Sequence, residues 1–264
     1  MEIEKLSERH SLFSTFLQRK VLLDFYFPPE IDSFEMQLLL INDGQDLSTM
    51  NFQNILKTLY EENQITPLLC VGIHCDAGRR NEYGTANVLN ENGLGSKARS
   101  YTQFVLEELL PFIEKKYKIF FKEKSFCGFS LGGLSAFDIV WNHPTEFSKV
   151  GVFSGSFWWR SLPQEDPDFK EDEHLIMQSE IRKGSYYPGL KFFFQTGALD
   201  ETADRNNNGI IDSIDDTISL IEELIKKGYD AEKDIFYLEL KDGKHDVSTW
   251  ARAFPQFLKW GWSK

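Results

Sequence analysis

The chain has 264 residues and a formal net charge of −12, because 41 acidic residues stand against 29 basic ones. An acidic surface repels phosphate backbones and anionic lipid headgroups, so we expect neither nucleic acid nor a membrane as a partner. Hydrophobic residues make up 41% of the chain, which is enough for a large core. No apolar run approaches the ~20 residues that span a bilayer.

The cellular location is predicted from the first residues and the cysteines. The first five residues, MEIEK, lack the positive segment and apolar stretch of a secretory signal. The three cysteines, Cys70, Cys75 and Cys127, are odd in number and form no CxxC pair, which favours a reducing compartment. The sequence therefore predicts a soluble, cytoplasmic protein and leaves the oligomeric state open.

Short apolar runs alternate with amphipathic segments along the chain. The apolar runs predict strands at residues 21–26, 36–41, 66–73, 125–128, 149–153, 190–196 and 234–240. The amphipathic segments predict helices at residues 97–116, 131–141, 214–227 and 249–260. This alternation predicts an α/β fold with a mostly parallel central sheet and helices on both faces. No repeat or linker interrupts it, so residues 1–264 are predicted to form one domain.

Residues 158–188 fit this alternation poorly, because they carry three prolines and many charges. We interpret them as an insertion over the sheet edge that acts as a partial lid, and a plain surface excursion is the alternative. Trp158 and Trp159 at its start are candidates for stacking on an aromatic acyl group of a substrate. Packing of these rings against the sheet explains them equally well.

The sharpest motif is G-x-S-x-G, formed by Gly128, Ser130 and Gly132 between a predicted strand and a predicted helix. That context is the one a nucleophile elbow requires, with the serine exposed above the sheet on a tight turn. Glycine neighbours are needed because a Cβ atom there would collide with the strand or the helix. Ser130 is therefore the predicted nucleophile, and the helix N-terminus beneath it favours developing negative charge.

Hydrolases with this elbow place the acid and then the histidine after the serine along the chain. The histidines are His10, His74, His143, His174 and His245. Only the last follows a late strand in a loop before a helix, so His245 is the predicted general base.

The acid is expected after the preceding strand, which makes Asp200 the first choice to orient the imidazole. Glu201 and Asp204 lie close by and remain alternatives. Asp246 is adjacent to His245 in sequence and is poorly placed to reach the same ring.

Together these motifs resemble the esterase family of α/β hydrolases that includes enterochelin esterases, esterase D and the mycolyltransferases. The similar segments are LLINDGQ at 39–45, RNEY at 80–83, the elbow, GALD at 197–200, and GKH at 243–245 followed by Trp250. The resemblance extends from about residue 21 to the end of the chain. The region before it has no room for the separate substrate-binding domain of the larger enterochelin esterases.

The resemblance implies an α/β-hydrolase fold and an oxyanion hole made by the backbone N–H groups of Gln45 and Leu131. It also implies that Arg80 and Tyr83 lie beside the active site, where Arg80 steers an anionic or catecholic substrate. An ion pair of Arg80 with Glu82 or another carboxylate is the alternative.

A polar loop after Asp200 matches a calcium-binding EF-hand loop at six positions. Its predicted ligands are Asp204, Asn206, Asn208, the Ile210 carbonyl and Asp215. A structural Ca²⁺ would hold the loop that carries Asp200. The alternative is a polar turn that caps the following helix.

The sequence thus predicts a serine carboxylic ester hydrolase with a Ser-Asp-His triad, no organic cofactor and a small-molecule ester substrate. Siderophore-like and aromatic esters are the candidate substrates. An acyltransferase or a thioesterase would use the same triad. A non-catalytic binding module with the hydrolase fold is the alternative from a different class.

Overall fold

In the computed structural model, residues 7–29 and 36–264 are described, and they contain one eight-stranded sheet in the order β1-β2-β4-β3-β5-β6-β7-β8. The strands are β1 Ser7–Ser14, β2 Arg19–Tyr26, β3 Gln37–Asn42, β4 Leu68–Ile73, β5 Glu123–Phe129, β6 Lys149–Phe153, β7 Lys191–Leu199 and β8 Ile235–Lys244. From β4 to β8 all neighbours are parallel, whereas β1 and β2 run antiparallel at one edge.

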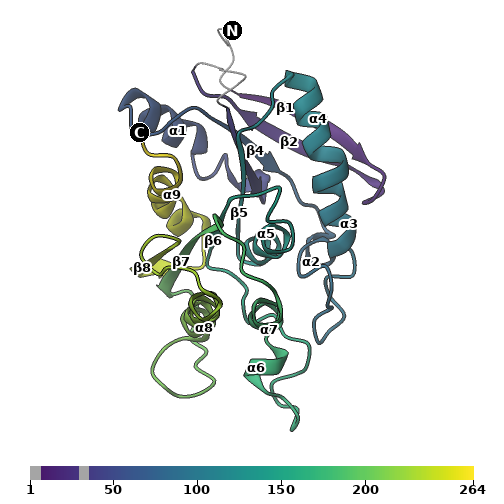
Figure 1. Ribbon diagram of the computed structural model, residues 1–264, viewed down its shortest axis with the longest axis vertical. Helices are drawn as coiled ribbons and strands as arrows, with labels where there is room; N and C mark the ends of the chain where they lie inside the picture. The colour runs from purple at the N-terminus through teal and green to yellow at the C-terminus, as the bar shows by residue number, and fades with distance from the viewer. Residues whose placement is uncertain (1–6, 30–35) are drawn as a thin grey trace.

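Helices connect the parallel strands. They are η1 Gly44–Asp46, α1 Phe52–Glu61, α2 Arg79–Glu82, α3 Ala98–Gln103, η2 Phe104–Leu109, α4 Leu110–Tyr117, α5 Leu131–Asn142, α6 Glu171–His174, α7 Ile176–Lys183, α8 Asp212–Lys227 and α9 Val247–Trp262. Helices α1 and α9 lie together on one side of the sheet, and α4 and α5 lie on the other (Figure 1).

The two faces of the sheet carry separate cores, and the alternation along each strand divides its side chains between them. In β3, Leu38 and Leu40 join the core under α4, α5 and α7, whereas Leu39 and Ile41 join the core under α1 and α9. All four side chains are 0% exposed, as expected for a strand covered on both faces. The predicted α/β-hydrolase arrangement is confirmed.

Each predicted strand and helix is present, with ends shifted by a few residues. Strand β1 was not predicted, because it lies at the sheet edge and only every second side chain faces the core. Helices α1, α2, α6 and α7 were also not predicted. The single helix expected at 97–116 contains a π-helical stretch, Phe104–Leu109, just before Pro111, whose ring nitrogen cannot donate to the preceding turn.

Within residues 158–188, α7 is part of the protein core. Its Ile176, Met177 and Ile181 side chains are buried in the cluster that also contains residues of α5 and α8. Helix α6 and the charged residues before it lie on the outside, and Arg160 pairs with Leu175 in an isolated bridge. The segment is therefore anchored at both ends, and a lid function stays a prediction.

Two further expectations concern membranes and export. Within the described ranges, no helix combines the length and apolarity that crossing a bilayer requires. The first five residues, on which the absence of a secretory signal was argued, lie outside the described residues.

Candidate active site

Ser130 stands between the end of β5 and the first residue of α5. Its backbone has φ 55° and ψ −124°, a conformation that non-glycine residues rarely adopt. The chain reverses so sharply here that the Ser130 carbonyl accepts the N–H groups of Gly133 and Leu134, and the Ser130 N–H donates to the Phe153 carbonyl at 2.9 Å. This strained strand-to-helix turn is the geometry of a nucleophile elbow.

The glycines of the motif are required by close backbone approach. A Cβ atom on Gly128 would lie 2.3 Å from the Gly132 carbonyl oxygen, and one on Gly132 would lie 2.5 Å from an Asp43 carboxylate oxygen. Neither contact can be relieved by turning a long side chain, because backbone or buried atoms are involved. The elbow therefore excludes any side chain at these two positions.

Two groups surround the Ser130 side chain, which is half-buried. The Ser156 hydroxyl lies 3.4 Å from the Ser130 hydroxyl, and the Ser156 N–H donates to the Ser130 carbonyl at 3.2 Å. The Leu131 N–H belongs to the first turn of α5, where amides have no partner within the helix. A role of the Leu131 amide in an oxyanion hole stays a prediction, and Ser156 is a neighbour that sequence reasoning did not identify.

The acid and base candidates leave adjacent strands side by side. Leu199 at the end of β7 is paired with Lys244 at the end of β8, and Asp200 and His245 are the next residues. Strands β5 to β8 are parallel, so Ser130 emerges at the same edge of the sheet. The sheet thus brings the three predicted triad residues to one edge.

Asp200 lies in a partly buried environment. The Gly197 N–H donates to its Oδ2 at 3.0 Å, and its Oδ1 is buried without a hydrogen-bond partner among the described residues. Burial raises the pKa of Asp200, while the Gly197 N–H, the Ser154 hydroxyl and the nearby charge of His245 lower it. Asp200 thus lies within electrostatic reach of His245.

The competing carboxylates hold backbone amides elsewhere. Glu201 accepts the Ser213 N–H at 2.6 Å at the start of α8. Asp204 accepts amides within its own loop, and Asp246 caps α9 by accepting the Thr249 N–H at 2.8 Å. These contacts leave Asp200 as the carboxylate best placed for His245.

The other histidines are also engaged away from Ser130. His74 Nε2 lies 2.7 Å from Asp24 Oδ2, and His10 Nε2 lies 2.9 Å from Glu8 Oε1. His174 contacts the Lys170 carbonyl at 3.0 Å. His143 ends α5 at the far end from the elbow, and burial lowers its pKa.

Trp250 in α9 contacts both the elbow and the candidate base. Its ring stacks on Phe129, the residue before Ser130, with 5.1 Å between ring centroids, and meets the edge of His245 at 5.4 Å. Its Nε1 donates to the Ser154 hydroxyl at 3.0 Å. One buried indole therefore contacts the residue next to the nucleophile and the candidate base, a role that the sequence did not reveal.

The predicted oxyanion-hole turn follows β3. Asp43 adopts the left-handed conformation with φ 58°, and Gln45 lies in the short helix η1. The Gln45 side chain is fixed, because its Oε1 accepts the Cys75 N–H and its Nε2 donates to the Cys75 sulfur, both at 3.2 Å. The Gln45 amide belongs to the first turn of η1, where it has no partner within the helix.

Comparison with known proteins identifies the family. The family described as "Putative esterase" matches residues 14–260 of the chain. The chain belongs to this esterase family. It is therefore an enzyme of the esterase type.

Among curated proteins, the esterase is 23% identical over 250 residues to the uncharacterized protein YbbA of Bacillus subtilis (strain 168), covering 90% of this chain and 91% of YbbA. Among solved structures, it resembles the enterochelin esterase of Shigella flexneri, with 20% identity and a TM-score of 0.74 over 97% of this chain. It spans 58% of that enterochelin esterase. The siderophore hydrolase EstB of Aspergillus nidulans is 17% identical, with a TM-score of 0.68 over 98% of this chain and 97% of EstB. These structures share the α/β-hydrolase fold of the esterase.

The arginine that reaches the site of this esterase is Arg79. Its neighbour Arg80 is exposed, because adjacent residues of a helix point about 100° apart. The alternative partner of Arg80, Glu82, is paired with Arg19 at 2.6 Å. Substrate steering by the exposed Arg80 stays a prediction, and the sequence did not single out Arg79.

Tyr83 and Trp159 lie in the protein core instead of contacting substrate as predicted. Tyr83 is 0% exposed, and its hydroxyl accepts the Asp43 N–H at 3.1 Å. Trp159 is 1% exposed and packs so closely on Gly84 that a Cβ there would lie 3.0 Å from the indole. Trp158 is 38% exposed and keeps a free surface, so its contact with substrate stays a prediction.

The predicted calcium loop is closed by its own hydrogen bonds. Asp204 accepts the N–H groups of Asn208 and Gly209, and Asp215 Oδ2 accepts the side-chain N–H groups of Asn206 and Asn208 at 2.9 and 2.7 Å. Across residues 7–29 and 36–264, no cluster of three His, Cys, Asp or Glu residues is placed to hold a metal. These contacts fit the alternative prediction of a polar turn before α8.

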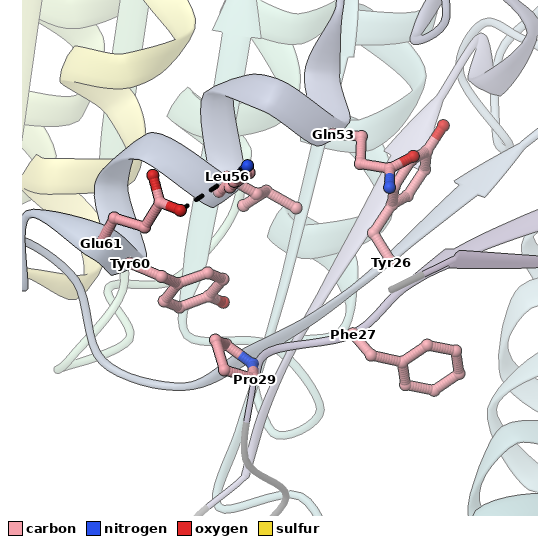
Figure 2. Close-up of a pocket in the computed structure, with 8 residues that line it drawn as sticks. Tyr26, Phe27, Pro29, Gln53, Leu56, Tyr60 and Glu61 are labelled. Carbon is pink, nitrogen blue, oxygen red and sulfur yellow. Dashed lines mark ion pairs between the residues drawn. The ribbon is translucent and has the colours of Figure 1, made fainter. Parts of the chain in front are cut away.

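A separate hollow of about 330 Å³ lies between α1 and the end of β2 (Figure 2). Tyr26, Leu56 and Tyr60 line it, and Figure 2 shows their side chains around it. Tyr26 is paired with Cys70 near the start of β4, so the hollow lies at the amino end of the parallel strands. Ligands of such sheets bind at the carboxyl ends, where Ser130 lies, so we assign this hollow no catalytic role.

Proposed function

We propose that this esterase hydrolyses carboxylic esters by two-step acyl transfer with Ser130, His245 and Asp200 as its catalytic triad. The Ser130 oxygen attacks the ester carbonyl carbon while His245 takes the hydroxyl proton. The tetrahedral intermediate collapses, the C–O bond to the alcohol breaks, and His245 returns the proton to the departing oxygen. Water then attacks the acyl-enzyme with His245 again as base, which releases the carboxylic acid and restores Ser130.

The developing oxyanion is proposed to be held by the backbone N–H groups of Gln45 and Leu131. Both amides lie in first turns without a partner inside their helices. Each such donor contributes on the order of 3 kcal/mol to lowering the barrier. Asp200 keeps the imidazole in the required tautomer and stabilises its charged form.

The observation that carries this proposal is the backbone of Ser130, with φ 55° and ψ −124° at a strand-to-helix turn. Strain of this kind is retained only where the surrounding structure enforces it, and it concentrates at functional sites. The neighbouring ends of β7 and β8 support the proposal, because they bring an acid and a histidine to the same edge.

We propose siderophore-like or aromatic esters as the substrate class. An enterochelin esterase and a siderophore hydrolase are among the proteins that share the fold. Trp158 offers a 38% exposed aromatic surface two residues after Ser156, which lies next to the nucleophile. Such a ring suits stacking on an aromatic acyl group.

Hydrolysis of p-nitrophenyl acetate and butyrate by the wild type and by Ser130→Ala tests the reaction. We expect saturable activity in the wild type and none above background in the variant. Activity that survives in Ser130→Ala would overturn the proposal. Product analysis with acyl-thioesters and with added acceptor alcohols then distinguishes a thioesterase or an acyltransferase, and inactivity on all esters would favour a binding module.

Calcium has no part in the proposed chemistry, and no organic cofactor is needed for it. The melting temperature in EGTA and in added Ca²⁺ tests the calcium prediction: a rise of several degrees with Ca²⁺ would support a bound ion, and an unchanged value would contradict it.

All three cysteines are free thiols, which supports the proposed location in the reducing cytoplasm.

A further inference from the structure

We propose that Arg79 and Asp43 form a positioning pair that holds the oxyanion-hole turn against the nucleophile elbow. This inference rests on the proposed function, because it concerns the placement of the Gln45 amide. Asp43 opens the turn in a left-handed conformation, with φ 58°, that is strained for a residue with a Cβ atom. The turn therefore needs outside contacts to keep its shape, and its neighbours supply them.

Arg79 binds the Asp43 carboxylate through two parallel hydrogen bonds. Its Nε lies 2.7 Å from Oδ1 and its Nη2 lies 2.8 Å from Oδ2. The Asp43 side chain is 2% exposed and the Arg79 side chain is 30% exposed, so the pair is largely withdrawn from water. Bidentate pairs of this kind fix orientation as well as distance.

The same guanidinium also contacts the elbow. Arg79 Nη2 donates to the Phe129 carbonyl at 3.3 Å, and Phe129 is the residue before Ser130. One side chain therefore binds the turn that carries Gln45 and the strand end that carries the nucleophile. These two segments must keep a fixed separation if both oxyanion donors are to meet one oxygen atom.

The turn and the elbow also touch directly. Asn42 Nδ2 donates to the Gly132 carbonyl at 2.7 Å, and the space where Gly132 would carry a Cβ is filled by the Asp43 carboxylate. Tyr101 donates to Asn42 Oδ1 at 2.5 Å and completes this buried connection. The Asp43 carboxylate is thus wedged between Arg79 and the first turn of α5.

Tyr83 and Cys75 also hold Asp43 in place. Tyr83 accepts its N–H at 3.1 Å, and the Arg79 guanidinium lies over the Tyr83 ring, 5.1 Å from the centroid. The Cys75 thiol donates to Asp43 Oδ1 at 3.2 Å, and burial raises the pKa of Cys75 to about 12. Cys75 is therefore a protonated donor at neutral pH, and it links Asp43 to the Gln45 side chain.

A lysine cannot replace Arg79 in this arrangement. An ammonium group is a point charge and does not present the planar fork that binds both carboxylate oxygens and the Phe129 carbonyl. It does keep the positive charge that the buried Asp43 needs. Arg79→Lys therefore keeps the positive charge beside Asp43 and removes the two parallel hydrogen bonds.

The test measures kcat and KM of Arg79→Lys on p-nitrophenyl butyrate. We expect kcat to fall about 10- to 100-fold and KM to change less than about twofold. This fall in kcat is smaller than the fall expected when an oxyanion donor is removed. The control is Arg9→Lys, because Arg9 in the edge strand β1 makes a similar bidentate pair with Asp24, at 2.6 and 2.8 Å, and donates no hydrogen bond to Asp43 or Phe129. Arg9→Lys should retain the wild-type kcat.

A double-variant cycle sharpens the test. Asp43→Asn combined with Arg79→Lys should be no slower than the slower single variant, since each change breaks the same pair. Wild-type kcat in a folded Arg79→Lys, or a rise in KM without loss of kcat, would overturn the inference. Failure of the proposed function would be distinct, because wild-type and Ser130→Ala proteins would then hydrolyse esters equally or not at all.

Discussion

The nucleophile half of the active site and its acid–base half are supported in different ways. Around Ser130, the elbow is confined by buried backbone and by Asp43, which is 2% exposed. Asp200 and His245 instead stand on loops beyond β7 and β8, and His245 is exposed. The difference follows from their tasks: a strained serine must be held by dense packing, whereas an imidazole that passes protons needs access and small movements.

We expect substitutions in the acid–base half to lower activity without lowering stability. His245→Gln should reduce kcat on p-nitrophenyl butyrate by about 10⁴-fold, because the general base is lost. The free energy of unfolding should change by less than about 0.5 kcal/mol, since the side chain is exposed. Urea unfolding and steady-state kinetics on the same preparation measure both.

His174→Gln is the matched control, because His174 lies in α6, where its ring contacts the Lys170 backbone and stacks on Phe169. His174→Gln should keep the wild-type kcat and the wild-type free energy of unfolding. Equal kcat in the two variants would refute the assignment of the base.

In the nucleophile half, substitution should lower stability and activity together. Gly128→Ala places a methyl group 2.3 Å from the Gly132 carbonyl oxygen, so we expect a loss of about 3 kcal/mol in the free energy of unfolding. Gly261→Ala in α9 is the control, because the nearest atom there is 3.8 Å away. It should be neutral or slightly stabilising. Similar urea midpoints for both variants would show that the elbow is not confined as described.

The elbow and the sheet could be predicted from sequence because they depend on local patterns. Gly128, Ser130 and Gly132 stand in one motif, and the apolar runs of β3 and β4 identify buried strands. The supports of the site could not be predicted, since they join distant segments. Arg79 reaches Asp43 across 36 positions and Trp250 reaches Ser154 across 96, and nothing local distinguishes Arg79 from Arg80 or Trp250 from other indoles.

A buried carboxyl in α5 makes the stability of the nucleophile half depend on pH. Burial raises the pKa of Asp138 from 3.8 to about 7, so between these values the folded state holds a proton that the unfolded chain releases. Stability therefore falls as pH rises from 5 to 8, by on the order of 2 kcal/mol from this group.

Asp138→Asn keeps an acceptor for the Ala86 N–H, which binds Oδ2 at 3.0 Å in the wild type, and should lack this fall. Urea unfolding of both proteins at pH 5 and pH 8 measures it. The same pH dependence in the variant would contradict the assignment to Asp138.

The smallest loss of stability and activity is expected at Trp250, where the nucleophile half meets the acid–base half. Trp250→Phe keeps a ring against Phe129 and His245 but loses the hydrogen bond to Ser154, so we expect about 1 kcal/mol less stability and a several-fold lower kcat. Trp260→Phe on the same helix serves as the control, because Trp260 packs on Phe193 and Phe257 away from the site. The kcat of Trp260→Phe should equal that of the wild type. An equal fall of kcat in both variants would contradict a specific role of Trp250 in the site.

The central claim, that Ser130 is the activated nucleophile, is tested most directly by covalent labelling. Wild-type protein is treated with a fluorophosphonate, and the modified residue is mapped by mass spectrometry of peptides. We expect one adduct on Ser130, slower labelling in His245→Gln and none in Ser130→Ala. An adduct on Ser156, whose hydroxyl lies 3.4 Å away, or labelling that persists in Ser130→Ala, would contradict the account.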